Sequence, residues 1–143
     1  MASIIEPILV HEIDGLPLRM FASPLYQKHR QPDFPWHSVD DLRQILRLDA
    51  DLDQAFQRRL KSDWPEDVRT VATSDGITTI GRHYMAMGML QFVRYRRQIL
   101  PTADRRRIET QVRIAATKAM KEMTKHLAPL ERLAVAMDAM EAL

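Results

Sequence analysis

Arginines are concentrated in one part of the sequence, and their side chains suit the binding of phosphate. Between residues 76 and 107 the chain carries seven Arg against one acid, Asp104. Arg donates fixed, bidentate hydrogen bonds to phosphate oxygens, and neutralising several phosphates releases counterions, which gives affinity without sequence choice. Most of the group flanks a predicted turn between two helices. With Tyr95, which would pack on a sugar or base, this basic cluster comprises Arg94, Tyr95, Arg96, Arg97, Arg105, Arg106 and Arg107.

A weaker set of candidate phosphate contacts lies earlier in the chain. It comprises Arg58, Arg59, Lys61 and Arg82. The basic cluster also has a second interpretation, in which the aliphatic stems of its arginines lie over a helical core and the guanidinium groups pair with Glu109 and Asp104. The sequence leaves both interpretations open.

Residue types used in catalysis are present but do not form a catalytic pattern. The five His residues do not stand at zinc-ligand spacing, Cys is absent, and no Gly-rich phosphate loop occurs. The paired carboxylates Asp40-Asp41 and Glu66-Asp67 fall at a predicted helix start and a turn, where capping accounts for them. We therefore predict no enzyme activity, no metal and no cofactor.

Two β-hairpins are predicted from their turn residues. Asp14-Gly15 separates the apolar runs EPILVHEI and LPLRMFA, and Asp75-Gly76 separates VRTVATS from ITTIG. An Asp-Gly pair between such runs is a strong hairpin signal. The stretch 23–35 between the hairpins holds three prolines and shows no periodicity, so we expect an exposed loop there.

Helices are predicted over most of the remaining chain. Ser38 and Asp49 are placed to cap two short helices that together span 38–62. The pair resembles a helix-turn-helix in outline, but acidic residues at the start of its second helix would repel phosphate, so an ordinary packed pair is favoured. Three further helices are predicted at 82–100, 103–128 and 129–143.

Length and composition favour one domain without a membrane segment. A chain of 143 residues buries a sizeable core, and no stretch approaches the run of about 20 apolar residues that spans a bilayer. The absence of Cys agrees with a reducing compartment. We predict an α+β protein of the cytoplasm, in which two β-hairpins pack with short helices and a helical C-terminal extension follows.

From Gly15 to about Val93 the chain resembles the N-terminal domain of the BRO and phage-antirepressor family. The resemblance rests on IDGLPLRMF, FPWHSVDDLRQILRL, the charged helix that follows, and SDGITTIGRHYMAMGMLQFV. In that family a strand carrying an aromatic leads into a helix that begins with an Asp-hydrophobic pair, and Trp36 and Asp41-Leu42 occupy those places. The resemblance implies a BRO-like α+β domain over 1–100, with a helical extension over 101–143 that packs on it or mediates association.

Two functions follow as hypotheses. The resemblance and the basic cluster together predict a DNA-binding regulatory protein of a phage or plasmid, antirepressor-like, whose partner is double-stranded DNA. The alternative is an inhibitor or adaptor that binds a protein partner, or a second copy of the chain, through the amphipathic helices of residues 105–143.

Overall fold

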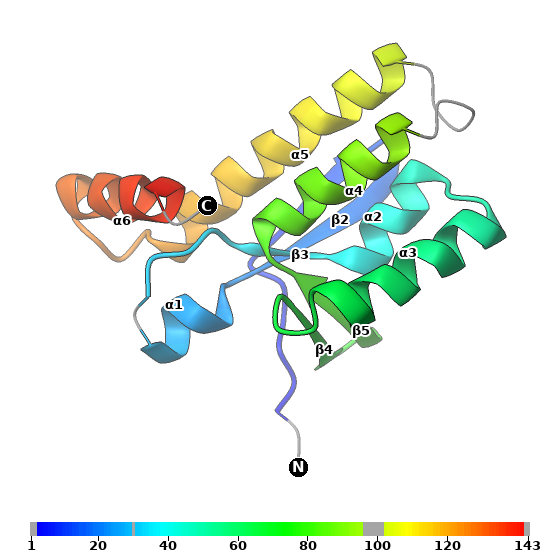
Figure 1. Ribbon diagram of the computed structural model, residues 1–143. Helices are drawn as coiled ribbons and strands as arrows, with labels where there is room; N and C mark the ends of the chain where they lie inside the picture. Colours follow the sequence, from blue (N-terminus) through cyan, green and yellow to red (C-terminus); the bar gives the residue numbers. More distant parts are fainter. Residues whose placement is uncertain (1–2, 30, 96–101, 142–143) are drawn as a thin grey trace.

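A five-stranded antiparallel sheet forms the centre of the protein. The computed structural model describes residues 3–29, 31–95 and 102–141, and gives no side-chain description for 28, 29, 93–95, 102 and 103. The strands are β1 (Leu9–Ile13), β2 (Leu16–Phe21), β3 (Trp36–Ser38), β4 (Val68–Thr73) and β5 (Gly76–Gly81). Their order in the sheet is β1-β2-β3-β5-β4, so the short β3 joins the two hairpins (Figure 1).

Both predicted hairpins are confirmed, and backbone geometry explains their turns. Asp14 has φ 55° and Gly15 has φ 78°, and Gly76 has φ 116° in the second turn. Positive φ is costly for most residues but accessible to Gly and, less readily, to Asp. The Asp-Gly pairs therefore mark the two places where the chain reverses.

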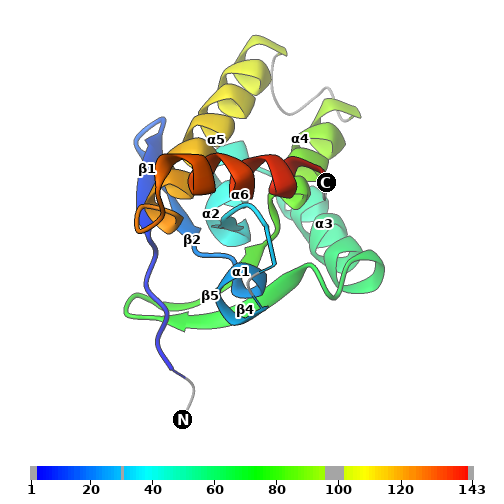
Figure 2. The same ribbon diagram turned by 90° about the vertical axis from the view of Figure 1, so that its left-hand side faces the viewer.

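Six helices surround this sheet in the described part of the chain. They are α1 (Pro24–His29), α2 (Val39–Leu46), α3 (Ala50–Asp63), α4 (His83–Tyr95), α5 (Thr102–Met123) and α6 (Pro129–Glu141). Helices α4 and α5 run beside one another, while α6 lies at the end of the molecule far from α3 (Figures 1 and 2). The predicted α+β class, with a helical C-terminal part, is confirmed.

The expected exposed loop at 23–35 is a wrong prediction for the described residues of that stretch. Ser23 is buried and its hydroxyl accepts hydrogen bonds from the backbone N–H groups of Leu25 and Tyr26, so it caps α1. Pro24 then occupies the first helical position, where a proline's missing N–H costs nothing. Proline marks a helix start here rather than a break. The carboxylate of the buried Asp33 accepts a hydrogen bond of 2.6 Å from the Ser23 hydroxyl.

The two predicted N-caps are confirmed, and one helix end is corrected. The side chain of Ser38 accepts from the backbone of Asp41, and that of Asp49 accepts from the backbone of Leu52. Helix α5 ends at Met123 rather than at 128. The buried Thr124 follows it and turns its hydroxyl back onto the Met120 carbonyl at 2.7 Å.

One hydrophobic core connects the N-terminal elements to the C-terminal extension. Buried residues of α5, including Ile108 and Val112, share a cluster with Leu18 of β2 and Leu42 of α2. A smaller cluster joins α6 to the rest, because Ala139 packs with Met120, Met123 and Tyr26. Among the described helices, none combines the length and the apolar character that crossing a bilayer would require.

Candidate nucleic-acid interface

Helix α5 is held against the sheet by a line of apolar and small residues. Ile108, Val112, Ala115 and Ala119 are almost completely buried. Alanines let the helix approach β1, β2 and α4 closely, and Gln111 adds a hydrogen bond of 2.8 Å to His11 of β1. The rotation of α5 about its own axis is thereby fixed, and so is the set of side chains that it turns outward.

The outward side of α5 is basic along most of its length. At 100° per residue, its exposed cations fall within a sector of about 140° that contains no Asp or Glu. We call this surface, together with Lys125 in the turn directly after the helix, the basic face, and it consists of Arg106, Arg107, Arg113, Lys118, Lys121 and Lys125. Its helical part, from Arg106 to Lys121, extends about 22 Å, or about six phosphate steps along one strand of a duplex.

Acidic residues neutralise the basic face only in part. Glu109 lies 2.8 Å from Arg113 within the helix, and Glu122 lies 3.3 Å from Lys125 in the turn that follows it. The side chains of Arg113 and Lys125 remain 64% and 72% exposed. Exposed pairs of this kind contribute little free energy, so a phosphate can displace the carboxylate at small cost.

Three cations of the basic face have no ion pair within the described part of the chain. They are Arg106, Lys118 and Lys121. Arg107 differs, because its guanidinium pairs with Asp14 at the tip of the β1–β2 hairpin and lies 3.6 Å from Asp104. The hydrogen bond between Arg107 and Asp14 lowers the pKa of the Asp14 carboxyl and raises the pKa of the guanidinium.

The structure places the predicted basic cluster only in part. Arg106 and Arg107 belong to the basic face, and Arg105 beside them is half-buried. Arg94 and Tyr95 form the last residues of α4, but their side chains lie outside the described part of the structure, as do Arg96 and Arg97. Of the alternative pairings, Asp104 does contact Arg107, whereas Glu109 pairs with Arg113.

Arg82 lies inside the protein rather than on a binding surface. Its side chain is 17% exposed and pairs with Asp33 at 3.2 Å and with Asp67 at 3.6 Å. The guanidinium carbon also lies 5.3 Å from the centre of the Tyr84 ring. Because these contacts occupy its charge, we do not include Arg82 in the candidate interface.

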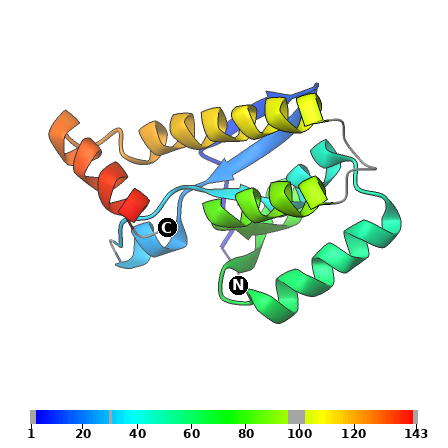
Figure 3. The ribbon, with the colours of Figure 1, turned by 45° about the horizontal axis from the view of Figure 1, so that its top comes forward.

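The cations of α3 are exposed but belong to another surface. Arg58, Arg59 and Lys61 point to solvent from the second half of α3. Helix α4 lies between α3 and α5 (Figure 3). The three residues therefore do not extend the basic face, and they provide a comparison set of equal charge.

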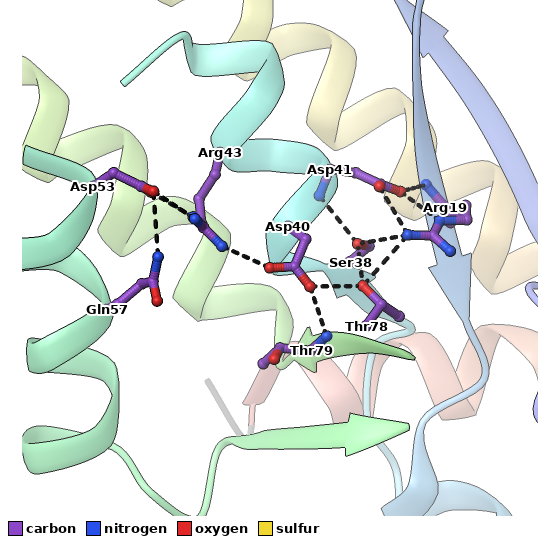
Figure 4. Close-up of polar contacts among 9 residues, drawn as sticks. All are labelled: Arg19, Ser38, Asp40, Asp41, Arg43, Asp53, Gln57, Thr78 and Thr79. Atoms are coloured by element: carbon purple, nitrogen blue, oxygen red, sulfur yellow. Dashed lines mark hydrogen bonds and ion pairs between the residues drawn. The ribbon is translucent and has the colours of Figure 1, made fainter. Parts of the chain in front are cut away.

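The carboxylates at the start of α2 hold secondary structure together. Asp41 accepts from the backbone N–H of Arg19 at 2.9 Å and from its guanidinium at 2.8 and 3.0 Å (Figure 4). Asp40 accepts from the Thr78 hydroxyl at 2.9 Å and from the backbone N–H of Thr79 at 2.8 Å. This network connects α2 to β2 and β5.

Arg43 extends the same network to α3. Its Nη1 lies 2.6 Å from Oδ1 of Asp40, and its guanidinium forms a bidentate ion pair with the Asp53 carboxylate (Figure 4). Hydrogen bonding to Arg43 lowers the pKa of the Asp53 carboxyl. The start of α3 is therefore occupied by an internal ion pair, which agrees with a packed helix pair rather than a DNA-reading one.

Sequence reasoning missed the C-terminal half of the basic face. Residues 108–143 hold five basic and five acidic residues, so the segment is neutral by count. The fold separates these charges, because Glu131, Asp138 and Glu141 belong to α6, while three of the five cations lie on α5 and Lys125 lies in the turn just after it. Helical periodicity of the charges themselves is the signal that would have found Arg113, Lys118, Lys121 and Lys125.

Comparison with known protein families, with curated proteins and with solved structures finds no match for this chain. No group of three or more His, Asp or Glu side chains suited to a metal ion occurs among the residues that the structure describes.

Proposed function

We propose that this protein binds double-stranded DNA through the basic face of α5. The observation that carries the proposal is a set of five exposed cations on one side of α5, in a sector where the helix itself carries no acidic residue, with Lys125 continuing the set in the turn directly after the helix. A rigid helix presents these charges at fixed positions, because its opposite side is buried against the sheet. The regulatory, antirepressor-like role in a phage or plasmid, exercised in the cytoplasm, is the part of the proposal that rests on the resemblance to the BRO family.

Contacts of this kind supply affinity rather than sequence choice. Arg and Lys neutralise backbone phosphates, and release of condensed counterions drives binding. The hydroxyls of Thr110 and Thr117 on the same side donate to the carbonyls of Arg106 and Arg113, so they do not donate to a ligand. We therefore expect the basic face to position a duplex without reading its bases.

Fluorescence anisotropy with a labelled duplex of random sequence tests the proposal. Saturable binding should weaken steeply between 50 and 200 mM salt, as phosphate neutralisation requires. Replacing Lys118, Lys121 and Lys125 together by Gln should lower the affinity at least tenfold. It should also reduce the salt slope by about three, one unit for each lost phosphate contact.

The cations of α3 give a matched control for the same experiment. Replacing Arg58, Arg59 and Lys61 by Gln removes the same charge from a surface that α4 separates from α5 (Figure 3). We expect this variant to bind within about threefold of the wild type, since only long-range attraction is lost. Equal losses in the two variants would reject the assignment to α5, and the absence of wild-type binding at 50 mM salt would reject DNA binding.

A second candidate function is supported by the outer side of α6. Leu130, Leu133, Met137 and Met140 follow the 3-4-3 spacing of a coiled-coil seam and are between 54% and 81% exposed. Apolar rows left in water usually mark a protein contact. We infer from this row that the protein also has an adaptor or inhibitor role, in which a partner helix packs on α6.

The charge beside this apolar row indicates the kind of partner helix. Glu131, Asp138 and Glu141 are exposed along one edge of the row. In an antiparallel pair of two copies these acidic edges would lie next to each other and repel. A helix whose own apolar row is bordered by Lys or Arg fits the surface better.

A further inference from the structure

An apolar pocket with a volume of about 270 Å³ opens between α3 and α4. Phe56 and Trp64 line it from the α3 side, and Tyr84, Met85 and Met89 line it from α4. Helix α3 lies on the side of the molecule remote from α6, and α4 lies between α3 and α5 (Figure 3). The pocket is therefore separate from both the basic face of α5 and the apolar row of α6.

Gly88 adds no side chain to the pocket. Gly88 lines it from the middle of α4, and a Cβ placed on Gly88 would have no atom within 4 Å. Glycine in a helix interior is destabilising relative to Ala. No turn, positive φ or close backbone approach requires glycine at this position. The consequence of glycine at this position is open space beside the pocket, which a larger side chain would occupy.

The pocket walls favour a flat aromatic ligand. The lining contains four ring-bearing residues, Phe56, Trp64, Tyr84 and Phe92, which offer ring faces or edges to a ligand, and two Met thioethers give adaptable contacts to ring edges. Trp64 is 38% exposed, so its indole is accessible to a ligand that enters from solvent. The volume is at the small end of ordinary ligand pockets, which suits one or two fused rings.

Arg59 gives the pocket its charge preference. Among the described residues that line the pocket it is the only charged one. Its guanidinium is 3.9 Å from Asp63, and its side chain is 62% exposed, so this ion pair leaves most of its hydrogen-bonding capacity unused. A carboxylate at the pocket mouth would find a bidentate donor.

We propose that the pocket between α3 and α4 is a binding site for a small aromatic carboxylate of one or two rings. The rings occupy the space between the Trp64 indole and α4 at Gly88, and the carboxylate stays at the pocket mouth, where it pairs with Arg59. The site is independent of the proposed DNA contact, because none of the described residues that line it lies on α5.

Titration with 2-naphthoate, followed by tryptophan fluorescence, tests the proposal. The sequence contains two Trp, and Trp36 is fully buried, so Trp64 is the indole that a ligand reaches. Saturable quenching is the expected result. Gly88→Leu should fill the pocket and lower the affinity at least tenfold, whereas Gly88→Ala should bind as the wild type does.

The two Gly88 variants control for folding as well as for space. Both replace glycine by a better helix former, so both should raise the thermal unfolding midpoint. Loss of binding in Gly88→Leu with retained binding in Gly88→Ala then reports filling of the pocket alone. Unchanged binding in Gly88→Leu, or no saturable quenching of the wild type, would overturn the proposal.

Arg59→Gln tests the charge preference separately. It should weaken 2-naphthoate binding at least fivefold and leave the binding of neutral 2-naphthamide unchanged. Glutamine keeps part of the aliphatic stem, so the apolar wall is disturbed little. Equal weakening of both ligands would show that Arg59 acts as part of the wall and would reject the carboxylate assignment.

Discussion

Arg107 at the start of α5 forms a two-pronged ion pair with Asp14 at the tip of the β1–β2 hairpin, and one of its arms measures 2.9 Å. The two residues are 93 positions apart in the sequence. Their pairing ties the N-terminal part of the long helix to the hairpin and places a carboxylate at the margin of the basic face. Asp14 thus limits the positive charge that this face offers to a phosphate.

Asp14→Asn should therefore strengthen DNA binding. The variant releases Arg107 while keeping a residue type that tolerates positive φ, so the turn is preserved. We expect a gain of about two- to threefold at 50 mM salt that fades as salt screens the charge. Asp63→Asn removes an equal charge from α3 and is the control. An equal gain in both variants would show that net charge alone controls affinity.

Buried His37 should make the protein less stable in mild acid. Its ring is almost fully buried, and within the described structure neither ring nitrogen has a hydrogen-bond partner. Burial, with a smaller contribution from His83, lowers the pKa of His37 from 6.5 to about 3. In the unfolded chain His37 is protonated below pH 6.5, whereas in the folded protein it stays neutral down to about pH 3. The free energy of unfolding therefore falls as the pH is lowered from 6.5 to about 3.

Urea unfolding at pH 7.5 and pH 5.0 measures this effect. The His37 contribution to the loss of unfolding free energy should be about 2 kcal/mol. His37→Phe replaces one ring by another and should remove most of this difference. A remainder is expected from His83, because burial lowers its pKa as well. Equal acid sensitivity of the wild type and His37→Phe would exclude His37 as the source.

The Arg19–Asp41 pair should be the most sensitive point of the polar network. Their side chains are 17% and 9% exposed, and Asp41 also accepts the Arg19 backbone N–H. Asp41→Ala leaves a shielded guanidinium and a backbone donor without their partner, so we expect a loss of about 3 kcal/mol in urea unfolding. Arg59→Ala, which breaks only the exposed pair with Asp63, should change stability by less than about 0.5 kcal/mol.

A joint substitution separates the ion pair from its surroundings. Arg19→Met together with Asp41→Leu replaces both charges by apolar side chains of similar size. This variant should be more stable than Asp41→Ala alone, because no isolated charge is left buried. Equal or greater destabilisation would show that Asp41 acts mainly through the backbone of Arg19.

Local chemistry made much of the fold predictable from the sequence. The turn at Asp14-Gly15 and the caps at Ser38 and Asp49 depend on residues within three positions of one another, so a sequence window contains the whole signal. Helix α1 also has a local signal, because Ser23 caps it from within three positions and Pro24 occupies its first position. It was missed because the prolines of 23–35 were interpreted as helix breakers, and the supporting hydrogen bond from Ser23 to Asp33 spans ten residues.

The candidate interface was predictable only at its beginning. Arg106 and Arg107 stand in a run of three arginines, which a count along the chain detects at once. Lys118, Lys121 and Lys125 are spread among apolar and acidic residues, so a count along the chain misses them, although their helical spacing indicates that they share a side. The rotation of a helix is set by packing, which counts along the sequence do not contain.

The apolar row of α6 should bind an amphipathic helix bordered by basic residues. A peptide with Leu at heptad positions a and d and Lys at e and g matches both the row and the acidic edge formed by Glu131, Asp138 and Glu141. Isothermal titration should show binding of this peptide and at least tenfold weaker binding of its Glu-substituted counterpart. Leu133→Gln together with Met137→Gln should abolish binding without lowering the unfolding midpoint, because both residues are more than half exposed. Equal affinity for the two peptides would show that the acidic edge has no role in binding. Light scattering tests the other occupant: if the wild type has twice the mass of 16.6 kDa and the double variant has 16.6 kDa, the row binds a second copy of the chain.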